Sequence, residues 1–267
     1  MASGTLRYYS LAQGGQVNIT YSIPADTPDF MVAENPNFKR PMKTLYLLHG
    51  YSGNESDWIY SGVAEDLAST YNLAVIMITA GNNFYLDRKA TGHQYCTFAG
   101  KEVVEFTRKL FGLSDKKEDT FIAGLSMGGF GALHTGLAFP ETFGGIVALS
   151  SALIIHEVGN MKPGEGNDVA NYEYYSEVFG DTTKVVESDA NPEVLYKRLK
   201  DEGKSIPPIY MAVGTEDFLY ENNQVMRKFL EDNDANMKYE EGPGIHDWKF
   251  WNKYIYNGVE WVLNTVG

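Results

Sequence analysis

This chain of 267 residues shows two different patterns of hydrophobic residues. Near its start, apolar and polar residues alternate over 5–10 and 16–22, and a glycine pair at 14–15 separates the two stretches. Strict alternation is typical of a strand with one buried face, and paired glycines favour a tight turn. The pattern therefore predicts an antiparallel hairpin at a sheet edge, followed by a proline-rich loop over residues 24–41.

From residue 44 onward, short continuous apolar runs alternate with amphipathic segments. Such runs are typical of strands buried on both faces of a parallel sheet, and apolar residues three or four positions apart are typical of helices. Strands that alternate with helices require crossover connections, so we expect an α/β fold with a mainly parallel, doubly wound sheet. Strands are expected at 44–48, 73–79, 121–124, 145–149, 208–213 and 236–240, and helices at 62–70, 101–111, 127–139, 222–232 and 249–263.

Residues 151–205 break the alternation. They are polar and rich in turn residues at 163–167, and then aromatic. We expect an insertion, or cap, that lies over the sheet edge within a single domain formed by residues 1–267. The tyrosine-rich stretch 172–175 is a candidate lid over a pocket, although such tyrosines also pack against one another in a purely structural role.

A serine stands where a predicted strand turns into a predicted helix, in the stretch Gly124-Leu-Ser126-Met-Gly128. Small residues two positions before and after the serine allow the strained turn of a nucleophile elbow, in which larger side chains would clash. The short motif is common, so its meaning depends on the rest of the chain. Ser126 is the candidate nucleophile if a base, an acid and an oxyanion hole lie at neighbouring strand ends.

The base is expected to be a histidine, because an unperturbed pKa of about 6.5 suits proton transfer near neutral pH. His246 follows the last predicted strand in a loop with glycine and proline, at the carboxyl end where open α/β sheets carry their sites. His134 lies inside the helix after the elbow, a position typical of packing, and His49 ends the first parallel strand. His93 and His156 lie in irregular stretches, so we expect His246 to be the base.

The orienting acid is expected between the serine and the histidine in the chain, which is the order typical of this fold. Asp217 lies just past the strand 208–213, where a short turn directs its carboxylate toward the site. Glu216 is the local alternative, and Asp181 and Asp189 lie in the insertion with no strand end to position them. We expect Asp217 to hold one ring nitrogen of the histidine and to stabilise the imidazolium that forms.

Two backbone N–H groups are needed to bind the oxyanion that forms during acyl transfer. Met127 follows the nucleophile and opens a helix, where the helix dipole favours negative charge. Tyr51 lies in the turn after the first parallel strand, and Gly50 before it allows the backbone to come close. The N–H groups of Met127 and Tyr51 are therefore the expected donors.

Composition narrows the function classes further. A formal net charge of −13 argues against a nucleic-acid or anionic-membrane partner, because both would be repelled. The single cysteine, Cys96, allows no internal disulfide and lacks the strand-turn-helix setting of a nucleophile. The five histidines show no metal-binding spacing, so we expect neither a metal nor a cofactor. The first residues lack the apolar core of a signal peptide, so we expect a cytoplasmic protein.

Four stretches together resemble the esterase D and tributyrin esterase family of α/β-hydrolases, at residues 47–53, 123–131, 214–220 and 246–248. The resemblance implies the α/β-hydrolase fold and a serine carboxylesterase that needs no metal or organic cofactor. The roles that it implies are those of nucleophile for Ser126, acid for Asp217, base for His246 and oxyanion donors for Tyr51 and Met127.

Related branches of that fold include S-formylglutathione hydrolases, feruloyl and acetyl-xylan esterases, and mycolyl-type acyltransferases. The glutathione branch usually carries Leu-Thr-Cys after its His-Gly, whereas this chain has Tyr51-Ser52-Gly53. An acyltransferase and an S-formylglutathione-type thioesterase remain alternatives to the carboxylesterase, and a catalytically silent scaffold is a third class.

Aromatic residues of the loops around the elbow are the expected lining of a substrate pocket. Such a cluster suits a cinnamoyl (feruloyl) group or the face of a sugar, but aromatics also form core or the wall of a short-chain acyl pocket. We therefore expect a small-molecule ester of a short-chain or cinnamoyl acid, carbohydrate-linked esters included, and the resemblance also favours a homo-oligomer. The candidate pocket residues are Trp58, Phe84, Tyr85, Tyr95 and Trp248.

Overall fold

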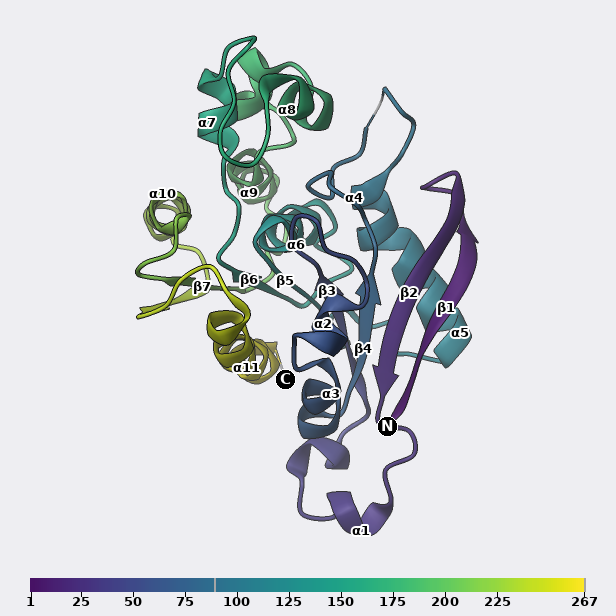
Figure 1. Ribbon diagram of the computed structural model, residues 1–267. Helices are drawn as coiled ribbons and strands as arrows, with labels where there is room; N and C mark the ends of the chain where they lie inside the picture. Colours follow the sequence, from purple (N-terminus) through teal and green to yellow (C-terminus); the bar gives the residue numbers. More distant parts are fainter. Residues whose placement is uncertain (89, 267) are drawn as a thin grey trace.

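The computed structural model describes residues 1–88 and 90–266, which form an eight-stranded sheet (Figure 1). Its strand order is β1-β2-β4-β3-β5-β6-β7-β8. Strands β3 to β8 run parallel, whereas β2 pairs antiparallel with both β1 and β4, so the predicted sheet with its N-terminal hairpin is confirmed. The strands are β1 Ala2–Ser10, β2 Gly15–Ile23, β3 Lys43–Leu48, β4 Leu73–Ile78, β5 Thr120–Leu125, β6 Gly145–Leu149, β7 Ile209–Gly214 and β8 Met237–Gly242.

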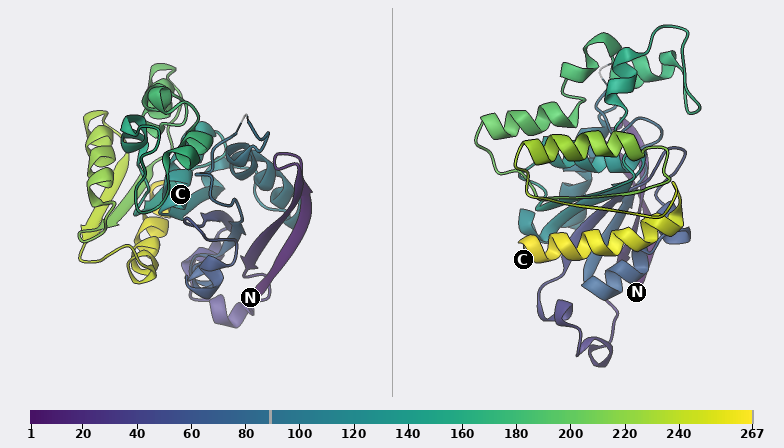
Figure 2. Two further views of the ribbon diagram at one scale, coloured as in Figure 1. Left: turned by 45° about the horizontal axis from the view of Figure 1, so that its top comes forward. Right: turned by 90° about the vertical axis from the view of Figure 1, so that its left-hand side faces the viewer.

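Helices cover both faces of the sheet, and Figure 2 shows α10 and α11 on opposite sides of it. None of the helices in the described ranges is long and apolar enough to cross a membrane. The α-helices are α1 Asp29–Val32, α2 Asp57–Tyr60, α3 Ala64–Tyr71, α4 Tyr95–Thr97, α5 Val103–Phe111, α6 Met127–Ala138, α7 Ile155–Asn160, α8 Tyr172–Phe179, α9 Pro192–Asp201, α10 Tyr220–Asp232 and α11 Trp248–Val266. Short 3₁₀ helices are η1 Pro36–Lys39, η3 Lys117–Asp119 and η4 Thr182–Glu187, and a π-helical turn, η2 Phe98–Glu102, joins α4 to α5.

The proline-rich segment 24–41 is not a plain loop, because it contains α1 and η1. The Asn35 side chain accepts a hydrogen bond from the N–H of Asn37 (2.9 Å) and so caps η1. The Asn72 amide, from the end of α3, donates to the carbonyls of Asn37 (3.1 Å) and Arg40 (3.2 Å). The two bonds from Asn72 come from a distant segment, so the local residue pattern does not predict them.

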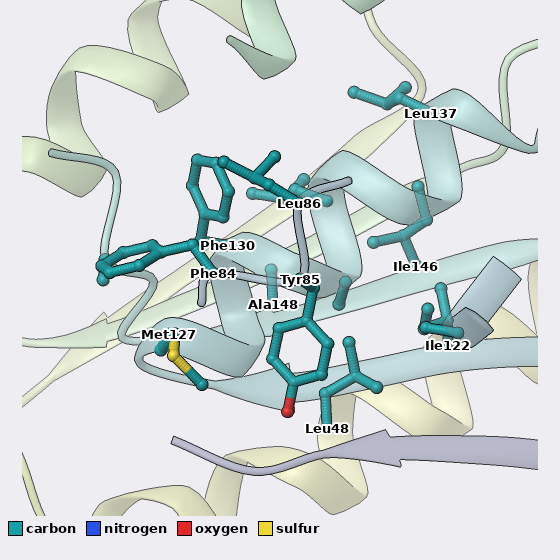
Figure 3. Packing of buried hydrophobic residues seen from close by; sticks show 14 of the residues in the cluster. Leu48, Phe84, Tyr85, Leu86, Ile122, Met127, Phe130, Leu137, Ile146 and Ala148 are labelled. Carbon is teal, nitrogen blue, oxygen red and sulfur yellow. The ribbon is translucent and has the colours of Figure 1, made fainter. Parts of the chain in front are cut away.

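The two faces of the sheet carry separate hydrophobic cores. Along β3, Tyr46 and Leu48 face the core under α5, α6, α9 and α10, whereas Leu45 and Leu47 face the core under α3 and α11. Successive residues of a strand point to opposite faces, so burying both faces requires a continuous apolar run. Figure 3 shows the first core, in which Leu48, Ile122 and Ile146 lie between the sheet and α6, while Phe130 of α6 packs against Phe84.

The segment 151–205 contains α7, α8, η4 and α9. Figures 1 and 2 show α7 and α8 beyond the carboxyl ends of the parallel strands, while α9 returns to pack against α6. The segment is thus placed above the edge of the sheet at which β5 ends, and it is close to the elbow.

Candidate active site

Ser126 occupies a strained turn between β5 and α6. Its backbone has φ 55° and ψ −120°, a conformation that residues other than glycine rarely adopt. Its N–H donates to the carbonyl of Leu149 in β6 (2.9 Å), and its carbonyl accepts from the N–H groups of Phe130 (3.1 Å) and Ala152 (2.9 Å). Neighbouring elements therefore hold the strained turn in place on both sides.

Glycines before and after the serine let the strand and the helix approach closely. A Cβ atom added to Gly124 would lie 2.2 Å from the carbonyl oxygen of Gly128, and one added to Gly128 would lie 2.4 Å from that of Leu48. Since these are backbone atoms of packed elements, neither contact could relax cheaply. The two glycines that mark the motif in the sequence thus have a steric reason in the fold.

Asp217, which is buried, and His246, which is half-buried, form a pair beside this turn. The Nδ1 atom of His246 lies 3.0 Å and 2.9 Å from the two carboxylate oxygens of Asp217. An ionised carboxylate can only accept, so Nδ1 carries the proton and Nε2 is left as an acceptor for a hydroxyl group. Asp217 also accepts from the N–H of Leu219 (2.8 Å), which fixes the orientation of the carboxylate.

The imidazole ring of His246 is held between two aromatic rings. The ring of Phe218 lies 4.6 Å from it on one side, and that of Trp251 lies 4.9 Å away and edge-on. The Trp251 indole N–H donates to the Ser150 hydroxyl (3.0 Å), so this ring is itself fixed. Both aromatic contacts restrict rotation of the imidazole away from Asp217.

Glu216, the local alternative to Asp217, contacts a different part of the loop. Its carboxylate accepts from the N–H of Gly244 (2.6 Å), and this hydrogen bond lowers the pKa of the Glu216 carboxyl. Gly244 belongs to the loop between β8 and α11 that carries His246. Glu216 therefore supports the path of that loop, and the carboxylate that faces the ring is that of Asp217.

His49 lies in the turn that precedes the expected oxyanion donor. Its Nε2 atom accepts from the N–H of Ala80 (3.1 Å), so the proton is on Nδ1, which donates to the carbonyl of Gly50 (2.7 Å). Burial lowers the pKa of the ring.

No acceptor in the described part of the chain pairs with the N–H of Tyr51, which leaves that group available to bind an oxyanion. The first N–H groups of an α-helix lack intrahelical partners, and this applies to Met127 at the start of α6.

We expect the free energy of unfolding to fall as the pH drops below about 6.5, the ordinary pKa of histidine. Burial lowers the pKa values of His49 and His134 in the folded state, so the unfolded chain binds these protons more readily. The stabilisation is complete above the unfolded pKa and is lost on acidification toward the folded values, with at most about 1.4 kcal/mol per pH unit for each ring. Urea unfolding between pH 5.5 and 7.5 measures the slope. If the free energy of unfolding of His49→Gln depends on pH as steeply as that of the wild type, the contribution assigned to His49 is wrong.

A cavity of about 730 Å³ opens over the elbow, and both Ser126 and His246 line it. Its volume lies in the range of small-molecule sites. The segment 151–205 supplies one part of the wall, through Ala152, Ile154, Glu157, Asn167, Asp168, Val169 and Tyr175. The rest of the wall is formed by Gly50, Tyr51, Asp57, Phe84, Leu125, Met127, Phe218, Leu219, Asn222, Trp248 and Trp251.

The lining differs from the expectation at three aromatic positions. Trp248 and Phe84 do line the cavity, whereas Trp58, Tyr85 and Tyr95 are not among its lining residues. Trp58 is buried behind Trp248, where its indole N–H donates to the carbonyl of Leu48 (3.1 Å). The sequence around an aromatic residue is equally apolar whether its ring lines a cavity or is buried behind the residues that line it.

Tyr85 and Tyr95 are placed elsewhere for equally local reasons. The hydroxyl of Tyr85, a buried residue, donates to the carbonyl of His49 (3.0 Å), and Figure 3 shows its ring in the core beside Leu48. Tyr95 stacks edge-on with His93 at the start of α4. The wall residue Tyr175 belongs to the stretch 172–175 expected as a lid, whereas Trp251 and Phe218 were not among the expected wall residues. Their one available signal was proximity in the chain to Asp217, His246 or the insertion.

Cys96 and the remaining histidines lie away from the cavity wall. Burial raises the pKa of the Cys96 thiol to about 12, so it stays protonated near neutral pH and is a poor nucleophile. Its sulfur lies 3.5 Å from Nδ1 of His134, inside the core beside α6. Over residues 1–88 and 90–266, no group of three or more His, Cys, Asp or Glu side chains is arranged to hold a metal ion.

Comparison with known proteins adds a family and relatives to this geometry. Residues 29–262 match the family described as "Putative esterase". An acetyl esterase of Caldicellulosiruptor saccharolyticus is 43% identical, with 98% of each chain covered. Two solved structures from Staphylococcus aureus, the fluorophosphonate-binding serine hydrolase FphF and the S-formylglutathione hydrolase FrmB, are each 30% identical over 98% of both chains, with TM-scores of 0.84 and 0.81.

Proposed function

The chain belongs to this esterase family, and from that premise we propose that Ser126, Asp217 and His246 form its catalytic triad. The protein is a carboxylic ester hydrolase, as its family and its acetyl esterase relative show. The observation that carries the proposal is that a serine in a strained elbow and an imidazole line one cavity, while a buried carboxylate lies on the far nitrogen of that imidazole. The three residues follow β5, β7 and β8, parallel strands that end at the same edge of the sheet, with β6 between β5 and β7.

In the proposed reaction, Nε2 of His246 takes the proton of Ser126 as its Oγ attacks the ester carbonyl carbon. The carbonyl oxygen becomes negatively charged and is bound by the N–H groups of Tyr51 and Met127. The tetrahedral intermediate collapses, the imidazolium protonates the departing alcohol, and an acyl group remains on Ser126. Water, deprotonated by His246, then attacks the acyl carbon and releases the acid and free serine. Asp217 stabilises the imidazolium and keeps its proton on Nδ1.

We propose esters of short-chain or cinnamoyl (feruloyl) acids as substrates, with alcohols that include carbohydrate hydroxyls. The apolar part of the wall around Trp248, Trp251 and Phe218 suits a small apolar or planar acyl group. The acetyl esterase relative supports the short-chain end of this range. An S-formylglutathione-type thioesterase is the second candidate, because FrmB is a relative of similar length.

A panel of acetyl, butyryl, octanoyl, palmitoyl and feruloyl esters of one phenol tests the acyl range. We expect kcat/KM to fall by about tenfold or more between the butyryl and palmitoyl esters, because an extended palmitoyl chain is longer than a compact cavity of about 730 Å³ and must fold back or displace the wall to fit. Initial rates at subsaturating substrate give kcat/KM directly. Equal rates on the palmitoyl and butyryl esters would contradict the small-pocket proposal.

A further inference from the structure

The cavity wall is acidic. Asp57, Glu157 and Asp168 line it together with Ser126, and the described lining residues include no lysine or arginine. We propose that this wall selects neutral and cationic esters over anionic ones, with Glu157 and Asp168 as specificity-determining residues. The inference rests on the proposed function, because it concerns the substrate that reaches Ser126. It names the class of alcohol or thiol that the site accepts.

The three carboxylates carry uncompensated charge. Within the described residues, none of them forms a salt bridge with a lysine, an arginine or a histidine. A carboxylate without a cationic partner keeps its full effect on a charged ligand. The summed field of the wall is therefore negative wherever a substrate enters.

Glu157 is held in position on its side of the cavity. It lies in α7, and its carboxylate accepts a hydrogen bond from the side-chain amide of Asn222 (2.6 Å). The same amide nitrogen lies 3.5 Å from the carbonyl of Leu153. The amide is neutral, so it orients the carboxylate of Glu157 and leaves its charge in place. Asn222 also lines the cavity, so the oriented pair faces the substrate.

Asp168 lies in the loop between α7 and α8, next to Asn167. The Asn167 side chain accepts from the hydroxyl of Tyr175 (3.0 Å) and from the N–H groups of Val169 and Ala170 (3.0 Å each). These bonds tie the loop to α8 and to itself, so Asp168 stays on the wall. Both Glu157 and Asp168 are exposed, which places their charges on the solvent side of the cavity.

Charge in a cleft with apolar walls acts over a longer range than on an open surface, because the walls exclude water and focus the field. Here Trp248, Trp251 and Phe218 provide such walls. An anionic group that enters is repelled by three like charges, while a hydroxyl group finds acceptors in the same carboxylates. A glutathione thioester carries two carboxylates and one ammonium group, so it belongs to the disfavoured class.

Three acetate esters of nearly equal shape provide the test: 3-acetoxybenzamide, 3-acetoxybenzoate and (3-acetoxyphenyl)trimethylammonium. Rates are divided by those of hydroxide-catalysed hydrolysis, which removes differences in intrinsic reactivity. We expect kcat/KM for the neutral ester to exceed that for the anion by about tenfold or more at low ionic strength, and the cation to react at least as fast as the neutral ester. The ratio of neutral to anionic kcat/KM should shrink severalfold at 0.5 M salt, where the Debye screening length is about 4 Å.

The double variant Glu157→Gln with Asp168→Asn assigns the effect to these residues. We expect its ratio of neutral to anionic kcat/KM to fall by about threefold to tenfold. The matched control, Glu65→Gln with Glu260→Gln, removes two exposed carboxylates of α3 and α11 that do not line the cavity and should keep the wild-type ratio. Fluorophosphonate titration of the active serine normalises each enzyme concentration.

Two results would overturn the proposal: equal normalised rates for the three esters in the wild type, or the wild-type ratio in the Glu157/Asp168 double variant. If the double variant does not fold, the salt dependence of the wild-type ratio still decides. Failure of the proposed function looks different. In that case the wild type hydrolyses none of the three esters faster than Ser126→Ala does.

Discussion

Replacing Ser126 with alanine is expected to lower kcat by a factor of about 10⁴ or more, because no other group can form the acyl-enzyme. The fold should be retained, since the elbow is held by backbone hydrogen bonds to Leu149, Phe130 and Ala152 that need no serine hydroxyl. Hydrolysis of 4-nitrophenyl acetate measures the loss, and thermal unfolding checks the fold.

The matched control for this variant is Ser205→Ala, which removes an exposed hydroxyl before β7 and should keep the wild-type rate. A fluorophosphonate probe adds a chemical readout, because it should label the wild type and Ser205→Ala but not Ser126→Ala. Labelling of the Ser126 variant, or activity within tenfold of wild type, would show that another residue is the nucleophile.

The second large effect is expected for Asp217→Asn, with a fall in kcat of about 10³- to 10⁴-fold. The asparagine can keep the hydrogen bond from Leu219, so its oxygen stays in place and its amide nitrogen faces His246. That nitrogen donates to Nδ1 and favours the tautomer that carries its proton on Nε2. A ring in this tautomer cannot take the proton of Ser126. The pre-steady-state rate of acylation measures the defect directly.

Glu216→Gln is the control that separates the two neighbouring carboxylates. Since a glutamine oxygen can also accept the hydrogen bond that Glu216 accepts from the N–H of Gly244, we expect a loss of less than about tenfold. Equal losses in the two variants would assign the orienting role to the loop as a whole. A larger loss for Glu216→Gln would make Glu216 the acid.

Most of the sheet could be predicted from the sequence because its signals are local. Continuous apolar runs such as 44–48 and 145–149 fall within β3 and β6, and the hairpin turn ends at Gly14, directly before β2 begins at Gly15. The helices outside the expected ranges are the short α1, α2, α4, η1 and η3, together with α7, α8, η4 and the ten-residue α9 of the segment 151–205. Segments of about one turn have no measurable periodicity, and side-chain caps and tertiary contacts decide whether they form.

The candidate site, too, has one part that the sequence predicts and another that it does not. Ser126, Asp217 and His246 each follow a strand, and parallel strands end at one edge, so chain order alone predicted that they meet. Their catalytic roles stay predictions until the substitutions above are made. The pocket wall could not be predicted so well, as Trp58, Tyr85 and Tyr95 demonstrate, because burial behind a wall and exposure on it require the same apolar side chains.

The sequence by itself thus determined the strand-turn-helix around Ser126, the order of its partners and the α/β class, all of which depend on neighbouring residues and on strand polarity. Only the tertiary structure decided that Glu157, Asp168 and Asn222 face the same cavity as the serine. The reason is physical: Glu157 and Asp168 come from a segment without a repeating pattern, and the positions of all three side chains depend on how α7, α8 and α10 pack against the rest of the fold. The acidity of the site is therefore a property of the fold.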